Sequence, residues 1–356
     1  MTDKQSFVEA YIHSTKLKLL SILFMAILCI VFAFWSLSTE AAGLTFEECV
    51  KYVIDTIMGV EYEQGSPDFY YSKYMWNYKA PRVVFAILAG AGLAVAGVAM
   101  QSVMNNPLAD PYTTGLSSGA CFGVALGMSI GFVVGSQTPL ESITFSFIFA
   151  MIPTAVLLMI APKTRASPST LILAGIAISY MFNAFTTLVL VSTDAGTLAQ
   201  VYQWQVGTIS GIPWSSVEIT AIIVIVGSII IGILSRSLNV LSLGDSSALS
   251  LGLDPEALRV ACLMVISFIV AVIVGSAGIL GFVGLMAPHI VRLVVGSDNR
   301  YVIPMSIMFG AVFILFCDIA SLIMSPLGSI PIGTVISVIG APIFLLLIIR
   351  RNANVW

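Results

Sequence analysis

The sequence predicts an all-α, polytopic membrane protein with ten transmembrane helices and with both termini in the cytoplasm. Of its 356 residues, 58% are apolar and 9% are charged, whereas a soluble domain carries about 25% charged residues. The charged residues lie between apolar runs of about 20 residues, the length of a helix that crosses a bilayer. A transmembrane barrel would show alternating segments of about 10 residues instead. The composition therefore excludes a soluble globular protein.

Ten apolar runs are predicted to span the membrane. They cover about residues 18–38, 82–104, 115–135, 143–161, 170–193, 217–235, 257–277, 280–295, 301–324 and 331–349. The first run is too long for a signal-peptide core. The eighth is short and contains Pro288, so we expect it to be tilted or broken. The expected division is an N-terminal segment over 1–17, a ten-helix domain over 18–351 and a tail over 352–356.

The lysines and arginines set the predicted orientation. With the N-terminus inside, eleven of the 15 basic residues fall on the cytoplasmic side, as the positive-inside rule requires. The four on the outer side are Lys51, Lys73, Lys79 and Arg82. Ten spans return the C-terminus to the cytoplasm, place 39–81 outside as a long loop and place 238–255 inside.

The outer loop over 39–81 is acidic and rich in aromatic residues, too aromatic for a disordered segment. We expect one short helix around 45–58 and an ordered cap at the membrane surface. Anchoring by aromatic side chains at the interface is one interpretation, and docking of a partner is the other.

Small residues recur every four positions in two of the predicted spans. Glycines occupy positions 115, 119, 123, 127, 131 and 135, and Ala86, Gly90 and Ala94 form a shorter series. Four residues advance about 400° around a helix, so each series forms one ridge along it. Such ridges let helices approach closely in lipid. With the many helix breakers, this pattern is typical of a transporter or channel.

The sequence lacks the residues that most enzymes need. The net charge is −3, so no nucleic-acid partner is indicated. The dipeptide Gly-Lys never occurs, which excludes a Walker A motif and ATP hydrolysis by this chain alone. Two histidines and five scattered cysteines indicate no metal site. Asp318 and His289 are interpreted as structural, and no catalytic residue is predicted.

Three stretches together form a recognisable pattern. The first comprises APR at 80–82, AGAGLA at 89–94, Gly97, Gln101, NPLADP at 106–111, Gly115 and SGA at 118–120. The second comprises GFVGL at 281–285, Pro288, His289 and Arg292, and the third PIGT at 331–334 and IGAPIFL at 339–345. In this order the sequence resembles the FecCD-type permeases over about residues 10–351. These are membrane subunits of type II ABC importers for iron-siderophores, haem and vitamin B12.

The resemblance implies ten helices per subunit and a pathway between two subunits. It implies two ATPase subunits below, which use the ATP, and a substrate-binding protein that docks from the extracellular or periplasmic side. No cofactor is expected on the chain itself. The expected location is the cell (inner, cytoplasmic) membrane. We expect a homodimer, because the chain holds one ten-span unit.

The resemblance also assigns roles to particular residues. The ATPase-coupling segment matches residues 243–253, with Leu249 and Leu251 as apolar residues to bury. The coupling residues are Leu243, Gly244, Ala248, Leu249, Leu251 and Gly252. The gate and pathway residues are Asn106, Leu108, Pro168, Ser169, Ser179 and Asn183. Lys79 and Arg82 match positions that dock the binding protein.

The resemblance leaves the substrate open. Ferric siderophore is the main expectation, and haem or a cobamide (vitamin B12) is the alternative. A secondary transporter that works alone is the competing class. That class usually needs buried carboxylates near the midplane, and the predicted spans offer mainly Asp318.

Overall fold

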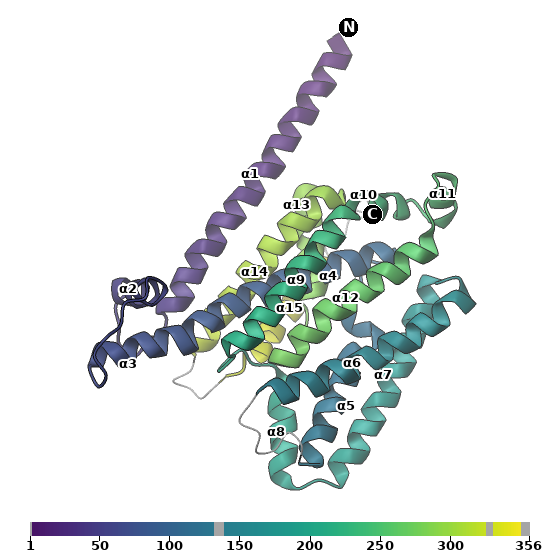
Figure 1. Cartoon of the computed structure of the whole chain (residues 1–356). Helices are drawn as coiled ribbons and strands as arrows, with labels where there is room; N and C mark the ends of the chain where they lie inside the picture. The colour runs from purple at the N-terminus through teal and green to yellow at the C-terminus, as the bar shows by residue number, and fades with distance from the viewer. Residues whose placement is uncertain (1, 132–138, 325–329, 350–356) are drawn as a thin grey trace.

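The computed structural model describes residues 2–131, 139–324 and 330–349, and this part of the chain is a bundle of helices (Figure 1). Each predicted span overlaps one helix. The ten helices are α1 (Thr2–Ser38), α4 (Ala80–Val103), α5 (Leu116–Ser129), α6 (Pro139–Ile160), α7 (Pro168–Val191), α9 (Trp214–Ile233), α12 (Pro255–Ala277), α13 (Val283–Val295), α14 (Asn299–Ile323) and α15 (Ile332–Ile349).

The prediction of an all-α polytopic membrane protein is confirmed. Within the described residues, seven helices are long and apolar enough to cross a membrane, and α5, α13 and α15 are shorter apolar helices. The number of ten crossings and the side of each terminus stay predictions. The predicted tail over 352–356 lies outside the described residues.

Shorter helices connect the long ones. They are α2 (Phe46–Ile57), α3 (Pro67–Tyr74), η1 (Met75–Lys79), η2 (Pro111–Thr114), η3 (Ala161–Thr164), α8 (Ala195–Val206), α10 (Ser235–Leu241) and α11 (Asp245–Ser250). The pair α10 and α11 lies at one end of the bundle, and α2, α3 and α8 lie toward the other (Figure 1). The predicted inner segment over 238–255 and the predicted outer loop over 39–81 thus lie toward opposite ends of the bundle.

The loop over 39–81 is an ordered cap, as expected, and α2 is the predicted short helix. Its N-terminus carries a capping box between Thr45 and Glu48, which satisfies two amide groups. The Tyr52 hydroxyl donates to Asp68 at 2.6 Å, so α2 is fastened to α3. The Trp214 indole donates to the Trp76 carbonyl at 2.8 Å and anchors the cap to α9.

The second span begins earlier than predicted. The expected start was residue 82, but α3, the π-helix η1 and α4 form one continuous helical run from Pro67 to Val103. The π turn ends two residues before Pro81. In regular α geometry the ring of this proline would clash with the carbonyl of residue 77. The wider turn removes that conflict, so the proline does not end the helix.

The core forms around α4, which packs against α14, α12, α13 and α9. Gly90 lies against the backbone of Gly310 on α14, and Gly97 lies against the Gly284 carbonyl on α13, so that a Cβ at either position would overlap it. Pro288 lies four residues after Gly284. It has no N–H, so it cannot donate the usual helical hydrogen bond to the Gly284 carbonyl. The helix α13 nevertheless continues through Pro288. Of the two expected alternatives, the break is excluded and the tilt stays a prediction.

The glycine ridge of the third span forms an internal contact, as predicted. Gly119 and Gly123 face the Phe149 and Phe145 carbonyls of α6. The helix itself ends at Ser129 and is shorter than expected, because Gly131 adopts a left-handed φ of 72° just beyond it, as helix C-termini often do. The predicted continuation over 132–135 lies outside the described residues.

Candidate functional site: coupling surface, gate and pathway

The predicted coupling segment over 243–253 contains the short helix α11, directly follows α10 and exposes apolar side chains. Leu243, Leu249 and Leu251 are 65%, 63% and 66% exposed, whereas Ala248 is fully buried. Gly244 (φ 97°) and Gly252 (φ 80°) lie on either side of α11 with positive φ, which only glycine adopts readily. The segment therefore presents leucines outward at one end of the bundle.

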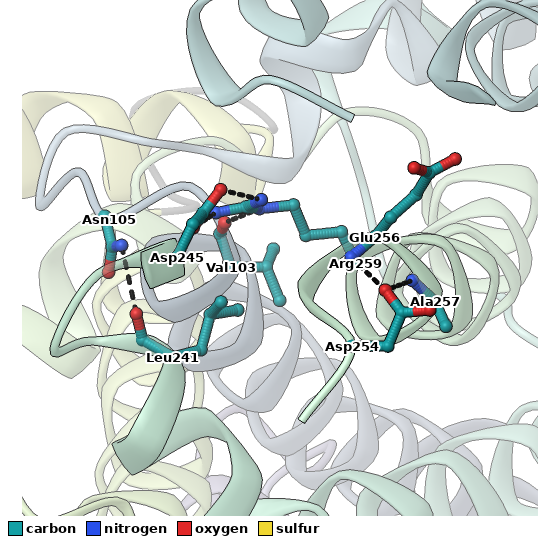
Figure 2. A network of polar contacts seen from close by, with 8 residues as sticks. All are labelled: Val103, Asn105, Leu241, Asp245, Asp254, Glu256, Ala257 and Arg259. Carbon is teal, nitrogen blue, oxygen red and sulfur yellow. Dashed lines mark hydrogen bonds and ion pairs between the residues drawn. The ribbon is translucent and has the colours of Figure 1, made fainter. Parts of the chain in front are cut away.

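A buried arginine of α12 holds the start of α11. Arg259 is 1% exposed, and its Nη1 and Nη2 donate to the two carboxylate oxygens of Asp245 at 2.8 and 2.6 Å. Its Nε donates to the Val103 carbonyl at the end of α4, at 2.9 Å (Figure 2). The guanidinium lowers the pKa of Asp245, so this carboxylate stays charged at neutral pH. Arg259 thus joins α4, α11 and α12.

The neighbouring helix α10 is fastened to α14. The Asn239 side-chain nitrogen donates to the Asp298 carboxylate at 2.7 Å, and the Asn239 side-chain oxygen accepts from the backbone N–H of Asn299 at 2.9 Å. Burial alone would raise the pKa of Asp298, but hydrogen bonds from Arg300 and Asn239 lower it to about 2. The coupling pair is therefore bound to the bundle on both sides.

The predicted gate residues Asn106 and Leu108 lie in the turn after α4. The Asn106 side chain accepts from the Leu108 amide nitrogen at 3.0 Å, and Leu108 is 47% exposed. The Asn105 side chain donates to the Leu241 carbonyl of α10 at 3.2 Å. The gate turn therefore contacts the coupling pair directly.

A second set of bonds ties the gate turn to α13. The Gln101 amide donates to the Pro107 carbonyl at 2.8 Å and to the Leu285 carbonyl at 3.1 Å. Its oxygen accepts from Arg292 at 2.7 Å. Gln101, Leu285 and Arg292 belong to the first two motifs of the sequence pattern, so the structure brings those motifs together.

The other predicted gate residues begin α7. Pro168 is the first residue of that helix, and Ser169 is exposed. Further along, Gly175 packs on the Thr113 backbone of η2, so α7 lies beside the segment that follows the gate turn. The structure thus places both predicted gate segments on adjoining elements.

Within the described residues, hydroxyl groups of α7 donate hydrogen bonds to carbonyls of the same helix. Ser179 donates to the Gly175 carbonyl at 2.8 Å, and Thr187 donates to the Asn183 carbonyl at 2.9 Å. Asn183 itself is exposed. In the most apolar 18-residue stretch of α7, 22% of the residues are buried. Most of this helix is open to lipid, to a second subunit or to a pathway.

The two predicted docking residues have partners within the chain. Lys79 is buried and donates to the Thr39 carbonyl. Arg82 forms an ion pair with Asp318, with Nε and Nη2 at 2.8 and 2.7 Å from one oxygen, and Ser36 donates to the other oxygen at 2.7 Å. Asp318 is fully buried, in agreement with its expected structural role. Docking through Lys79 and Arg82 stays a prediction.

A cavity of about 470 Å³ lies beside Arg82, toward the α8 end of the bundle. Its described lining residues are Arg82, Gln203, Thr208, Ser210, Ser321, Leu322, Ile330, Pro331 and Ile332. Among the described lining residues, the polar side chains other than Arg82 carry hydroxyl or amide groups, and Arg82 is paired with Asp318.

The sequence reasoning missed α8 and therefore Gln203 and Thr208. The signals were present: Asp194 caps the helix through the Gly196 and Thr197 amides, and Gly207 (φ 80°) follows its last residue. Gly207 lies against the Ile279 carbonyl, so α8 packs on the α12–α13 turn.

No cluster of three or more potential metal ligands occurs among the residues described. The five cysteines are buried and free, as expected for small apolar core residues. The described site therefore consists of helix contacts, the predicted gate turn and a cavity with polar side chains.

The fold is that of a polytopic helical membrane protein with exposed apolar side chains at one end. The chain belongs to the FecCD transport family, whose family model matches residues 27–350. It is therefore a permease of the ABC-transporter type, which resolves the class against a transporter that works alone.

Curated relatives agree over nearly the whole chain. An ABC transporter permease protein of Methanocaldococcus jannaschii is 35% identical and covers 94% of this chain and 96% of its own. The Fe(3+)-citrate import system permease YfmE of Bacillus subtilis is 33% identical, with coverage of 94% and 96%. The vitamin B12 import permease BtuC of Vibrio cholerae is 31% identical, with coverage of 78% and 83%.

Solved structures share the fold. A metal-chelate type ABC transporter in an inward-facing conformation is 27% identical, with a TM-score of 0.79 over 93% of this chain and 99% of that one. The PsaBC complex of Streptococcus pneumoniae has a TM-score of 0.53 at 18% identity, over 83% of this chain and 95% of that one. The second likeness concerns the fold alone.

Proposed function

We propose that this permease forms the transmembrane pathway of an importer for a metal chelate, with ferric siderophore as the substrate. The observation that carries the proposal is the near full-length similarity to the metal-chelate type transporter. A relative named for Fe(3+)-citrate import, matching 94% of the chain, supports iron. The polar cavity beside Arg82 offers hydroxyl and amide groups to a chelate.

The proposal includes the partners that the chain needs. A second copy completes the pathway, and two ATPase subunits bind the α10–α11 surface and use ATP. A substrate-binding protein docks at the opposite end, near the cap over 39–81. The assembly resides in the cell membrane, and the chain itself hydrolyses nothing.

Cobamide is the second candidate, because vitamin B12 permeases of Vibrio cholerae and Halobacterium salinarum are 31% and 35% identical to the chain. Haem remains a further alternative of the same transport class. The binding protein selects the ligand, so the permease surface alone does not separate these substrates.

The test is uptake into proteoliposomes that hold the permease, its ATPase and its binding protein. Radiolabelled ferric siderophore, cyanocobalamin and haem are offered separately, with ATP inside. The proposal expects ATP-dependent uptake of the ferric chelate. Uptake of cyanocobalamin or haem, without uptake of the ferric chelate, would overturn the proposed substrate. Uptake without the ATPase would overturn the proposed ATP-driven mechanism.

A further inference from the structure

The coupling helices and the gate turn are joined by polar contacts at two points. Arg259 contacts Asp245 of α11 and the Val103 carbonyl of α4 at the same time. Asn105 contacts the Leu241 carbonyl of α10. Figure 2 shows both contacts in one view, with the arginine lying between α12 and α11. The end of α4 is thus bonded to α11 through Arg259, and the turn after α4 is bonded to α10 through Asn105.

The arginine contact is stiff. Its guanidinium is planar and presents its donors as a fixed fork, and three of its nitrogens are in use within 2.9 Å of their acceptors. A residue that is 1% exposed has little room to change rotamer in a close-packed interior. The Val103 carbonyl lies in the last turn of α4, where carbonyls lack a helical partner, so Arg259 supplies that bond.

The other end of the link is α11, which is too short to be stable without contacts to the bundle. The six residues of α11 are too few for a stable isolated helix, because helices shorter than about 12 residues are marginal in water. The position of α11 is therefore set by its contacts with the bundle. Ala248 and the Asp245 carboxylate face Arg259 and the bundle, while Leu249 faces solvent.

We infer that Arg259 is a positioning residue that transmits displacement of α10 and α11 to the gate turn at residues 104–108. The inference rests on the proposed coupling of this surface to an ATPase. When α11 moves, the Asp245–Arg259–Val103 link moves the end of α4 with it. The turn then follows α4, because Gln101 of α4 also holds the Pro107 carbonyl on the far side of the turn.

The test uses two variants of the link in the full complex, held in lipid nanodiscs for hydrogen exchange and in proteoliposomes for uptake. Asp245→Asn weakens the ion pair at its half-exposed end, where the carboxylate is 47% exposed. Arg259→Lys keeps the charge but cannot serve three acceptors with a planar fork. The matched control is Glu256→Gln, which also changes a carboxylate to an amide and lies in the first turn of α12, three residues before Arg259 (Figure 2).

Hydrogen exchange is measured over residues 102–110 and 242–252. Asp245→Asn should speed exchange about threefold or more in both segments, within the usual range of coupling energies. Glu256→Gln should change neither segment. Faster exchange in 242–252 alone would overturn the inference, because it would show that the gate turn does not follow α11.

Uptake per ATP hydrolysed gives a second readout that a merely structural role would not move. With the ATPase still bound, both variants should lower this ratio about threefold or more, and the double variant should lower it no further. An unchanged ratio in both variants would overturn the inference. If the wild-type complex transports no chelate, the proposed function fails, while hydrogen exchange still decides the link.

Discussion

Exposed leucines and a buried arginine reverse the usual distribution of side chains at the coupling segment. Leu243, Leu249 and Leu251 are each more than 60% exposed, while Arg259 is 1% exposed. Single exposed leucines are ordinary, but a group of exposed apolar residues is typical of an interaction surface. The arginine is tolerated inside because Asp245 and a carbonyl satisfy it.

The first prediction concerns that surface. Leu249→Asp and Leu251→Asp should reduce copurification of the ATPase, because a carboxylate buried at the interface without a partner costs several kcal/mol. Thermal stability of the permease should not change, since both side chains are exposed. Leu249→Met is the matched control and should retain the ATPase. Normal copurification with both aspartate variants would place the coupling contact elsewhere.

The second prediction concerns Arg82 and Asp318. Arg82→Gln leaves a fully buried carboxylate without its cation and should lower the free energy of unfolding by about 3–5 kcal/mol. The double variant Arg82→Gln/Asp318→Asn should recover most of that loss, because two neutral amides can bond to each other. Denaturant unfolding in detergent measures both. Equal stability of the single variant and wild type would contradict the pair's structural role.

The same double variant tests docking without disturbing the fold. It removes the charge of Arg82 while it leaves no buried charge unpaired. If Arg82 docks the binding protein, association should slow several-fold, most clearly at low salt, because rim charges act mainly on the association rate. Association kinetics equal to wild type would leave the contact to other residues of the cap over 39–81.

At the scale of elements, glycine contacts set how close α4 lies to its neighbours. Gly90 and Gly310 face each other across the α4–α14 contact, and Gly97 faces Gly284 across the α4–α13 contact. Between apolar helices in lipid, close packing replaces the hydrophobic effect as the source of affinity. These contacts fix the helix to which the gate turn and the Arg259 link are attached.

The third prediction is that Gly90→Ala destabilises the bundle. The new Cβ would overlap the Gly310 carbonyl, so α4 and α14 must separate, at a cost of about 1–3 kcal/mol. Gly232→Ala is the matched control: it is also helical, in α9, with nothing within 4 Å of the new Cβ. The control should be neutral or stabilising by up to about 1 kcal/mol. Equal stability of the two variants would show that the α4–α14 contact yields easily.

At the scale of the whole molecule, one chain leaves much of its apolar surface uncovered. In the most apolar 18-residue stretch of α1, 11% of the residues are buried, and in that of α7, 22% are buried. The corresponding share for the helical run that contains α4 is 83%. Lipid covers part of such a surface, and a second subunit can cover another part. The exposed polar residues Asn183 and Thr187 on α7 favour protein or water over lipid on their face.

The fourth prediction is therefore a homodimer. Native mass spectrometry of the purified complex should show two permease chains of identical mass together with two ATPase chains. The reason is that one ten-helix unit with an exposed polar face on α7 lacks the opposite wall of a pathway. A complex with two permease chains of different mass would contradict the prediction.

The sequence by itself determined the class, the family and nearly every long helix, because lipid imposes length and composition on each span. It also predicted the glycine contacts of α4 and α5, since a period of four residues defines one helix face. It missed α8, and it missed the continuation of α4 back to Pro67, because the signals for connecting helices and π turns are short and local.

Only the tertiary structure decided the partners of the charged residues. Arg82 and Asp318 are 236 positions apart, and Arg259 meets both Asp245 and the end of α4, 156 positions away. No local pattern encodes such pairings, because they depend on which helix faces meet after packing. The fold gives both predicted docking residues partners within the chain: Lys79 is buried, and Arg82 is partly exposed and paired with Asp318. It also places Arg259 between the predicted coupling segment and the end of α4.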